Sequence, residues 1–396
     1  MWSQNATTSR CRRTIALPSL ESTDVTSKPT STNWLAAKHT LAKVAILRAY
    51  LQAWFQIMGR TQAGKDVLYI DGFAGPGYYE GNEPGSPIAA LEVLKDAIAK
   101  MGSAWMVLKV HVVFVEQDRA RFEALKRATK PYSNDDHFFV YLFDAPFDSA
   151  FEQLVRQVPQ FFEQRLPLFA FLDPFGVKGL RFDQVARILE SPLSEALINF
   201  DADGVGRVFK AGDAADHERI LRDVFGTDTW KSALDASQPM QAVVREVLNF
   251  YRNCLAALPR VSYTFPFEMR KHTTSIEYYL VFASQHHRGL EKMKEAMRSI
   301  DQSGSYQFCD STTQQTVFRF DCPQDYATGI AAHFAGQTVL LSDIRDYVLV
   351  QTPLVKFKGI LQSLERGGRL TVQSSDPDRR KRSFKDDQIL SVTFTK

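Results

Sequence analysis

An apolar strand runs directly into a glycine-rich loop in the segment Val67-Leu68-Tyr69-Ile70-Asp71-Gly72-Phe73-Ala74-Gly75-Pro76-Gly77. Three glycines within six residues allow a sharp turn and the close approach of a ligand, because glycine has no Cβ. Their spacing is not that of the nicotinamide fingerprint, and the loop lacks the lysine followed by serine or threonine of a phosphate-binding loop. The acid that ends the strand instead suits a ligand with positive charge or hydroxyl groups, such as S-adenosylmethionine.

Four further predicted strands also end at or beside an acid. The strands cover residues 110–115, 137–143, 167–172 and 195–200, and the acids are Glu116, Asp144, Asp173 and Asp201. Ligands of open α/β sheets bind beyond the carboxyl ends of the strands. Any one of these acids is also explained as a cap of the helix that follows it. The full set beside the glycine loop favours a binding site over capping.

We therefore predict that S-adenosylmethionine binds at this edge of the sheet. The glycine loop would contribute Asp71, Gly72, Phe73, Ala74, Gly75 and Gly77. Glu116 is expected to hold the ribose hydroxyls, and Asp144 to receive the adenine amino group. Lys38 and His39 lie near the start of a predicted amphipathic helix over residues 34–58, and we expect them to face the cofactor or the substrate. A surface lysine and a solvated histidine are the alternative interpretation.

The composition narrows the class of protein. The chain has 396 residues, of which 44% are hydrophobic and 23% charged, as in ordinary globular proteins of one or two domains. No run of about eighteen apolar residues occurs, so we expect no membrane span. The four cysteines lack metal-ligand spacing, which predicts a cytoplasmic protein without a metal site. We expect residues 1–33, rich in serine and threonine, to form a poorly ordered tail.

The predicted fold class is α/β, with a Rossmann-like sheet. The pattern of residues 204–260 indicates a helical insertion after the fifth strand, and two more strands follow over residues 261–268 and 275–282. A seven-stranded sheet that closes with a late pair is typical of class I methyltransferases, which is a comparison of folds alone. We therefore predict a methyltransferase-like domain over residues 34–315.

Residues 316–396 are predicted to form a separate winged-helix domain. Three short helices, a double glycine and two strands follow one another, and the third helix of such domains commonly enters a DNA groove. Residues 353–385 hold nine bases and three acids, a net charge of +6. We expect phosphates of RNA or DNA to contact Lys356, Lys358, Arg379, Arg380, Lys381 and Arg382. A solvated hairpin tip and a protein partner are the alternatives.

Several motifs together resemble the three-Cys-motif partner (TcmP) family of bacterial proteins. They are Trp34 with Lys38-His39, Tyr50-Leu51, the glycine loop with its strand, Gly85-Ser86-Pro87, Phe114-Val115-Glu116, Leu172-Asp173-Pro174-Phe175-Gly176 and Tyr278-Tyr279-Leu280-Val281-Phe282. The resemblance covers nearly the whole chain from Trp34 onward. It implies a methyltransferase-like protein whose partner bears a cysteine motif, and it does not supply a substrate.

The fourth strand ends in Asp173-Pro174-Phe175-Gly176, which we predict to be the catalytic segment. This sequence resembles the motif of tRNA guanine-N2 dimethyltransferases more closely than that of adenine or cytosine methyltransferases. Asp173 and the Pro174 carbonyl are expected to accept hydrogen bonds from an amino group, while Phe175 stacks on the base. The alternative is a helix cap followed by a core phenylalanine.

These observations predict an S-adenosylmethionine-dependent methyltransferase that acts on an exocyclic amino group of a nucleobase in RNA or DNA. Two other interpretations stay open. One is a nucleic-acid-binding or scaffolding protein that keeps the fold without turnover and works with a partner. The other is an enzyme that uses the cofactor for a different transfer, or that acts on a protein or a small molecule.

Overall fold

The computed structural model describes residues 36–163, 166–212, 214–272, 275–301, 305–309 and 323–395. The predicted N-terminal tail and Trp34 lie outside these ranges, as do Cys11 and Cys322. Within the described ranges, the helices are too short or too polar to cross a membrane.

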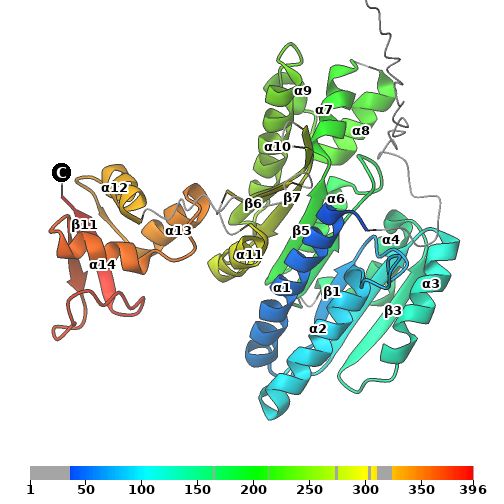
Figure 1. The fold of residues 1–396 in the computed structure, drawn as a ribbon, viewed down its shortest axis with the longest axis horizontal. Coiled ribbons are helices and arrows are strands. Elements are labelled where there is room, and N and C mark those ends of the chain that lie inside the picture. Colours follow the sequence, from blue (N-terminus) through cyan, green and yellow to red (C-terminus); the bar gives the residue numbers. More distant parts are fainter. Residues whose placement is uncertain are drawn as a thin grey trace, which may run out of the picture. The chain divides into compact units, whose positions relative to one another are not determined.

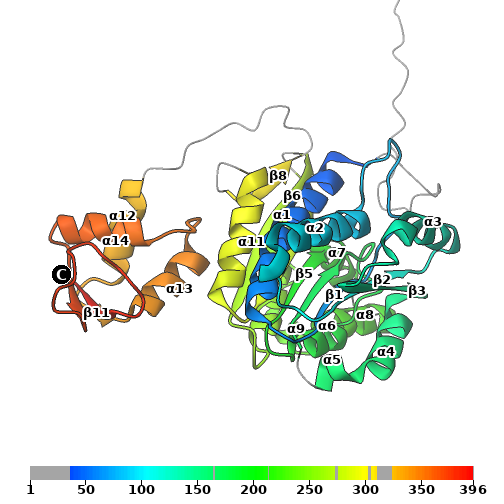
Figure 2. The same ribbon diagram turned by 90° about the horizontal axis from the view of Figure 1, so that it is seen from below.

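An eight-stranded sheet with the order β3-β2-β1-β4-β5-β7-β6-β8 forms the centre of the fold. Its strands are β1 (Val67–Asp71), β2 (Val110–Glu116), β3 (Phe138–Asp144), β4 (Leu168–Leu172), β5 (Ser194–Phe200), β6 (Tyr263–His272), β7 (Ser275–Ser284) and β8 (Gln307–Cys309). The first five strands are parallel, and β7 is antiparallel to both of its neighbours. The predicted parallel sheet with a late pair is confirmed. The short strand β8, which lies beside β6 (Figure 2), was not predicted.

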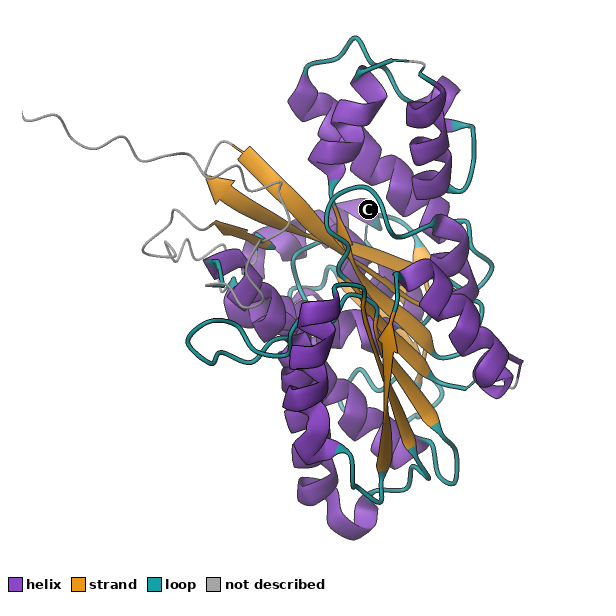
Figure 3. Ribbon diagram, turned by 90° about the vertical axis from the view of Figure 1, so that its right-hand side faces the viewer, coloured by secondary structure: helices purple, strands orange, loops and turns teal. Residues whose placement is uncertain are grey.

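Helices cover both faces of this sheet (Figures 1 and 3). One hydrophobic cluster joins the first face to α1 (Lys38–Thr61), α2 (Ser86–Met101), α3 (Arg119–Thr129) and α11 (His287–Ile300). A second cluster joins the other face to α4 (Phe147–Gln157), α5 (Pro159–Glu163), α6 (Phe182–Leu189), α7 (Ala202–Lys210), α8 (Ala215–Phe225), α9 (Trp230–Ala233) and α10 (Met240–Ala256). The central strands β1 and β4 are apolar up to their last residues because both of their faces are covered. The predicted helical insertion therefore belongs to the second layer of helices.

The chain reverses its course across the sheet between β1 and β4. From β1 it continues to β2 and β3 on one side, and it then returns to β4 and β5 on the other. Asp71 ends β1 beside Phe171 of β4, and Glu116 ends β2 beside Asp144 of β3. The carboxyl ends of the parallel strands thus share one edge, and ligands of doubly wound sheets bind at such a switch point.

The described C-terminal residues have a hydrophobic core of their own, in which Ile330, Ile344, Leu361 and Val392 are buried. The elements are α12 (Pro323–His333), β9 (Thr338–Val339), α13 (Leu341–Gln351), α14 (Lys358–Arg366), β10 (Leu370–Ser374) and β11 (Ile389–Phe394). The three helices and the hairpin follow in the predicted order. The short strand β9 completes an antiparallel sheet with the order β10-β11-β9.

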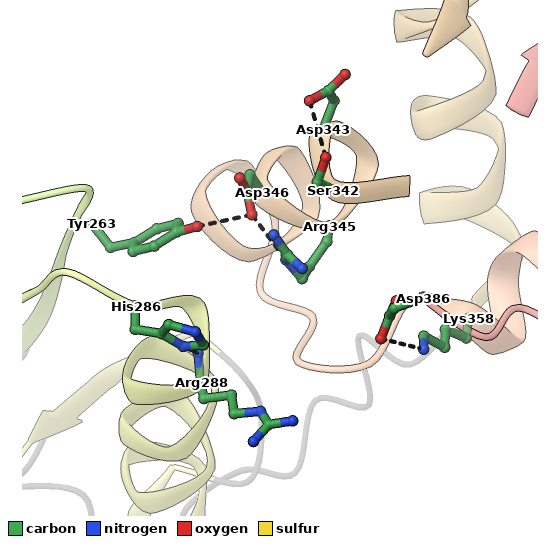
Figure 4. A network of polar contacts seen from close by, with 9 residues as sticks. All are labelled: Tyr263, His286, Arg288, Ser342, Asp343, Arg345, Asp346, Lys358 and Asp386. Atoms are coloured by element: carbon green, nitrogen blue, oxygen red, sulfur yellow. Dashed lines mark hydrogen bonds and ion pairs between the residues drawn. The ribbon is translucent and has the colours of Figure 1, made fainter. Parts of the chain in front are cut away.

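Polar contacts hold α13 against α11 and β6. The buried Lys294 side chain of α11 donates hydrogen bonds to three carbonyls at the end of α13, those of Leu349 at 2.9 Å, Thr352 at 2.7 Å and Leu354 at 2.9 Å. Burial lowers the pKa of Lys294 to about 7, but only its protonated form has three donors for three carbonyls. Figure 4 shows a second contact, in which the Tyr263 hydroxyl of β6 donates to Asp346 at 2.9 Å.

Candidate functional site

The glycine loop leaves space beside one of its glycines. Gly75 has a φ of +66°, and nothing lies within 4 Å of the position that a Cβ would occupy. Gly77 has a φ of +92°, but a Cβ there would lie only 2.8 Å from the Cβ of Ala128. Side chains are strained at both values of φ. Of the two, Gly75 faces open space in which a ligand can approach the main chain.

The first part of the loop packs on the protein interior. A Cβ at Gly72 would lie 2.8 Å from the ring of Phe147, and the ring of Phe73 packs on the same phenylalanine with centroids 5.4 Å apart. Ala74 is buried. Gly72, Phe73 and Ala74, which we predicted to bind the cofactor, therefore hold the loop in shape through these contacts.

Glu116 is bound to the glycine loop. Its Oε2 accepts a hydrogen bond from the N–H of Gly75 at 2.9 Å, and its Oε1 accepts one from the N–H of Asp118 at 2.7 Å. Burial raises the pKa of the Glu116 carboxyl, and the positive charge of Arg121 opposes this rise. Each oxygen has a second lone pair, so Glu116 retains acceptors for two ribose hydroxyls. The next helix, α3, is capped by Asp118 and not by Glu116.

Asp144 ends the edge strand β3 beside Glu116 and forms an ion pair with Arg119. The Arg119 side chain is 74% exposed. Solvent screens an exposed pair of this kind, so a ligand can compete for its carboxylate. Asp144 therefore lies on the predicted edge with an accessible acceptor.

Asp71 is the most deeply buried acid of the site. Its Oδ1 accepts a long hydrogen bond from the N–H of Phe73 at 3.4 Å, and its Oδ2 has no hydrogen-bond partner within the described residues. Burial raises the pKa of Asp71 to about 7. Hydrogen bonds from the Ser86 side chain and the Phe73 N–H oppose this rise, and the charges of Asp173 and Glu116 add to it. A buried carboxylate without a counter-charge is costly, and a cationic ligand would relieve that cost.

Asp173 is held by two side chains that the sequence did not single out. The Nζ of Lys43 in α1 lies 2.7 Å from Oδ1 and 2.6 Å from Oδ2 of Asp173. The Asn199 side chain of β5 donates to Oδ1 at 2.6 Å. The sequence did contain a signal for Lys43, because it interrupts the apolar stripe of α1 four residues after His39, on the same helix face. Asn199 lies near the end of β5, after the apolar run Ala196 to Ile198.

The two predicted residues at the start of α1 differ in their surroundings. Lys38 is exposed, whereas His39 is buried. The His39 ring makes an edge contact with Tyr278 at 5.8 Å, and the Lys43 Nζ lies 5.1 Å from the centre of the same tyrosine ring. His39 therefore belongs to the group of side chains around Asp173.

The residues after Asp173 form an accessible segment. Phe175 is 52% exposed, so it is not the core residue of the alternative interpretation. Gly176 has a φ of +70°, and together with Pro174 it lines a small cavity. Helix capping explains only the acid after the fifth strand, since Asp201 accepts a hydrogen bond from the N–H of Gly204 in α7 at 2.7 Å.

The predicted phosphate contacts fall into two groups. Arg379 is internal, because its guanidinium forms two parallel hydrogen bonds with Glu365 of α14 at 2.9 and 3.0 Å and a third with the Ser383 carbonyl. Lys358 pairs with Asp386 at 3.0 Å. The exposed bases are Lys356, Arg380, Lys381 and Arg382. We therefore remove Arg379 from the predicted phosphate contacts, because its charge is already matched within the protein.

Histidine, cysteine, aspartate and glutamate side chains in the described ranges form no group that could hold a metal ion. Cys254 is a free thiol.

Significant similarity to known proteins is found among solved structures. No protein-family model matches the sequence, and no curated protein is significantly similar to it. The chain is similar to an O-methyltransferase from Bacillus cereus in complex with SAH, at 16% identity and a TM-score of 0.30, over 60% of this chain and 80% of that one. It is also similar to a methyltransferase from Podospora anserina with SAH bound, at 15% identity and a TM-score of 0.27, over 59% and 78%. TM-scores this low carry no argument about activity.

The charges at this edge of the sheet leave one acid uncompensated. Asp173 is paired with Lys43, and the charge of Arg121 acts on Glu116. Within the described residues, Asp71 forms no ion pair. A ligand that brings a positive charge to Asp71 and hydroxyl groups to Glu116 therefore fits the residues that are present. S-adenosylmethionine, which carries an ammonium and a sulfonium charge next to a ribose, meets this requirement.

We predict that binding of S-adenosylmethionine depends on the ionisation of Asp71. Because burial places the pKa of Asp71 near 7, this group gains a proton as the pH falls through about 7, and it then no longer attracts a cation. The dissociation constant, measured by calorimetry, should rise up to about tenfold per pH unit between about pH 7 and pH 5.5.

The Asp71→Asn variant provides the comparison. It should bind more weakly than the native protein at about pH 8, and its affinity should be nearly constant with pH. Asp96→Asn, which removes an exposed acid of α2, should retain the native pH dependence. Native affinity that does not change with pH would contradict this role of Asp71.

Proposed function

We propose that this protein is an S-adenosylmethionine-dependent methyltransferase. The observation that supports it best is Asp71, a buried carboxylate with an unpartnered oxygen, which ends β1 at the switch point of the sheet and begins the loop that contains the open Gly75. The strand order with its late antiparallel β7 adds support, because class I methyltransferases share this architecture.

Each predicted cofactor residue has a distinct role in this proposal. Asp71 attracts the cationic methionine part, Gly75 lets it approach the main chain, and Glu116 holds the ribose hydroxyls. Asp144 accepts the adenine amino group in competition with Arg119. When bound, S-adenosylmethionine supplies a methyl group on a positively charged sulfur.

The proposed acceptor is an exocyclic amino group of a nucleobase. Lys43 and Asn199 both donate hydrogen bonds to Oδ1 of Asp173, and the Lys43 ammonium also lies 2.6 Å from Oδ2, so Oδ2 is the oxygen that can accept a further hydrogen bond. That oxygen and the Pro174 carbonyl can each accept one hydrogen of an amino group. The exposed ring of Phe175 is suited to stacking on the base, which contributes about 1–3 kcal/mol.

The proposed polymer that carries this base is RNA or DNA. The C-terminal elements have the helix and hairpin order of a winged-helix domain. Three of the exposed bases, Arg380, Lys381 and Arg382, lie in the β10–β11 turn, and Lys356 precedes α14. Glu365 stabilises this turn, because it binds the Arg379 guanidinium and also accepts a hydrogen bond from the N–H of Arg382 at 2.9 Å. Three neighbouring side chains, those of Arg380, Lys381 and Arg382, are thereby presented to solvent.

We also propose the more specific features that the sequence predicts. They are membership of the TcmP family, a partner protein with a cysteine motif, a cytoplasmic location in a bacterium, and a domain boundary near residue 315. The motifs that carry the resemblance include the glycine loop and Asp173, which lie at the same sheet edge.

We predict that Asp173→Asn reduces methyl transfer about 100-fold or more, because the amide presents a donor where the amino group needs an acceptor. The affinity for S-adenosylmethionine should stay within about threefold of the native value. Transfer is measured with tritiated cofactor and bacterial RNA or unmethylated plasmid DNA. Asp203→Asn, which breaks an exposed pair in α7, serves as the control. An equal loss of affinity and transfer would assign Asp173 to the cofactor.

The hairpin makes a separate prediction about nucleic-acid binding. We replace Arg380, Lys381 and Arg382 with glutamine and measure the slope of the logarithm of the DNA-binding constant against the logarithm of the salt concentration. The magnitude of this slope should fall by about 2–3, because up to three phosphate contacts are lost. A triple glutamine variant at Lys100, Arg156 and Arg219, exposed bases of other helices, removes the same charge and should not change the slope. Equal slopes for both triple variants would exclude the hairpin from the interface.

A further inference from the structure

The cation beside the predicted catalytic acid is the least expected feature of the site. Lys43 lies on α1, far from Asp173 in sequence, and its side chain is only 9% exposed. It contacts both oxygens of Asp173 and lies over the Tyr278 ring. Burying an ammonium group is costly unless a carboxylate pairs with it, and Asp173 is the carboxylate that pairs with Lys43.

Two acids lie close together at this point, and only one of them is paired. Asp71 ends β1, and Asp173 follows the last residue of the adjacent strand β4, so the negative charge of Asp173 adds to the rise in the pKa of Asp71. Without Lys43, both acids would attract the positive charge of a ligand. With Lys43 in place, Asp71 alone remains to attract it.

Lys43 also limits how Asp173 can meet the acceptor. Its two contacts and the Asn199 hydrogen bond leave Oδ2 as the oxygen that can accept a further hydrogen bond. The orientation of that oxygen is fixed, because the carboxylate is held from two elements, α1 and β5. A free carboxylate would turn, and an error of about 1 Å in the position of a reacting group costs about 100-fold in rate.

We infer that Lys43 is a positioning residue for methyl transfer. It orients Asp173 toward the acceptor group and leaves Asp71 as the carboxylate for the cationic cofactor. This inference rests on the proposed function. Lys43 itself does not touch the reacting atoms, and it acts through Asp173.

Two substitutions separate this role from a merely structural one. Lys43→Met keeps most of the length of the side chain and removes the charge, and we expect it to lower kcat at saturating nucleic acid about 100-fold. Its affinity for S-adenosylmethionine at about pH 8 should fall by no more than about threefold, because Asp71 is retained and the loss of the Lys43 charge does not weaken the attraction of a cation. Lys43→Arg should recover transfer to within about tenfold of native, because a guanidinium can also bind both carboxylate oxygens.

The assay measures transfer from tritiated S-adenosylmethionine to total bacterial RNA and to unmethylated plasmid DNA, with cofactor affinity measured by calorimetry on the same samples. Lys100→Met, which removes an exposed lysine paired with Asp96, is the matched control and should behave as native.

The outcomes distinguish the inference from the function on which it rests. The positioning role alone is overturned if Lys43→Met transfers methyl groups at the native rate. It is also overturned if this variant loses as much cofactor affinity as it loses transfer. Failure of Lys43→Arg to exceed Lys43→Met overturns it as well. A native protein that binds S-adenosylmethionine but labels neither nucleic acid overturns both the proposed function and the role of Lys43.

Discussion

Carboxylates that are buried together repel one another and lose their hydration, and this constraint governs the whole edge of the sheet. The parallel strands bring Asp71, Glu116 and Asp173 to one place because their carboxyl ends coincide. The helices of one face then supply compensation, with Lys43 from α1 and Arg121 from α3. The acid that stays uncompensated, Asp71, ends the strand that leads into the loop containing the open Gly75. The proposed binding of a cationic cofactor rests on this imbalance.

Much of this arrangement could be predicted from local sequence. A few consecutive residues are enough to recognise the glycine loop, the parallel strands and the acids at the strand ends. Alternating apolar residues indicate a half-buried strand, and a continuous apolar run indicates a fully buried one. The same holds for the order of helices and hairpin near the C-terminus. Strand β8 was not predicted, because it consists of only three residues, Gln307 to Cys309, which are too few to show a pattern.

Which charged or polar side chain pairs with which acid could not be predicted in this way, because the two partners come from elements that are distant in sequence. Lys38 was chosen near the start of α1, yet Lys43 faces the site, since the packing of α1 on the sheet decides which side of the helix points inward. Asn199 looked like one polar residue within β5. Arg379 belonged to a run of four bases, and nothing local revealed that Glu365 of α14 would bind its guanidinium.

The most direct test of the central claim is a calorimetric titration with S-adenosylmethionine of the native protein and of Gly75→Val. Gly64→Val is the matched control, because Gly64 has a similar φ of +67° with equally open surroundings but lies before β1, away from the acids. We predict micromolar binding by the native protein and by Gly64→Val, and no measurable binding by Gly75→Val. Absence of binding by the native protein, or unchanged binding by Gly75→Val, would contradict the claim that this sheet edge holds the cofactor.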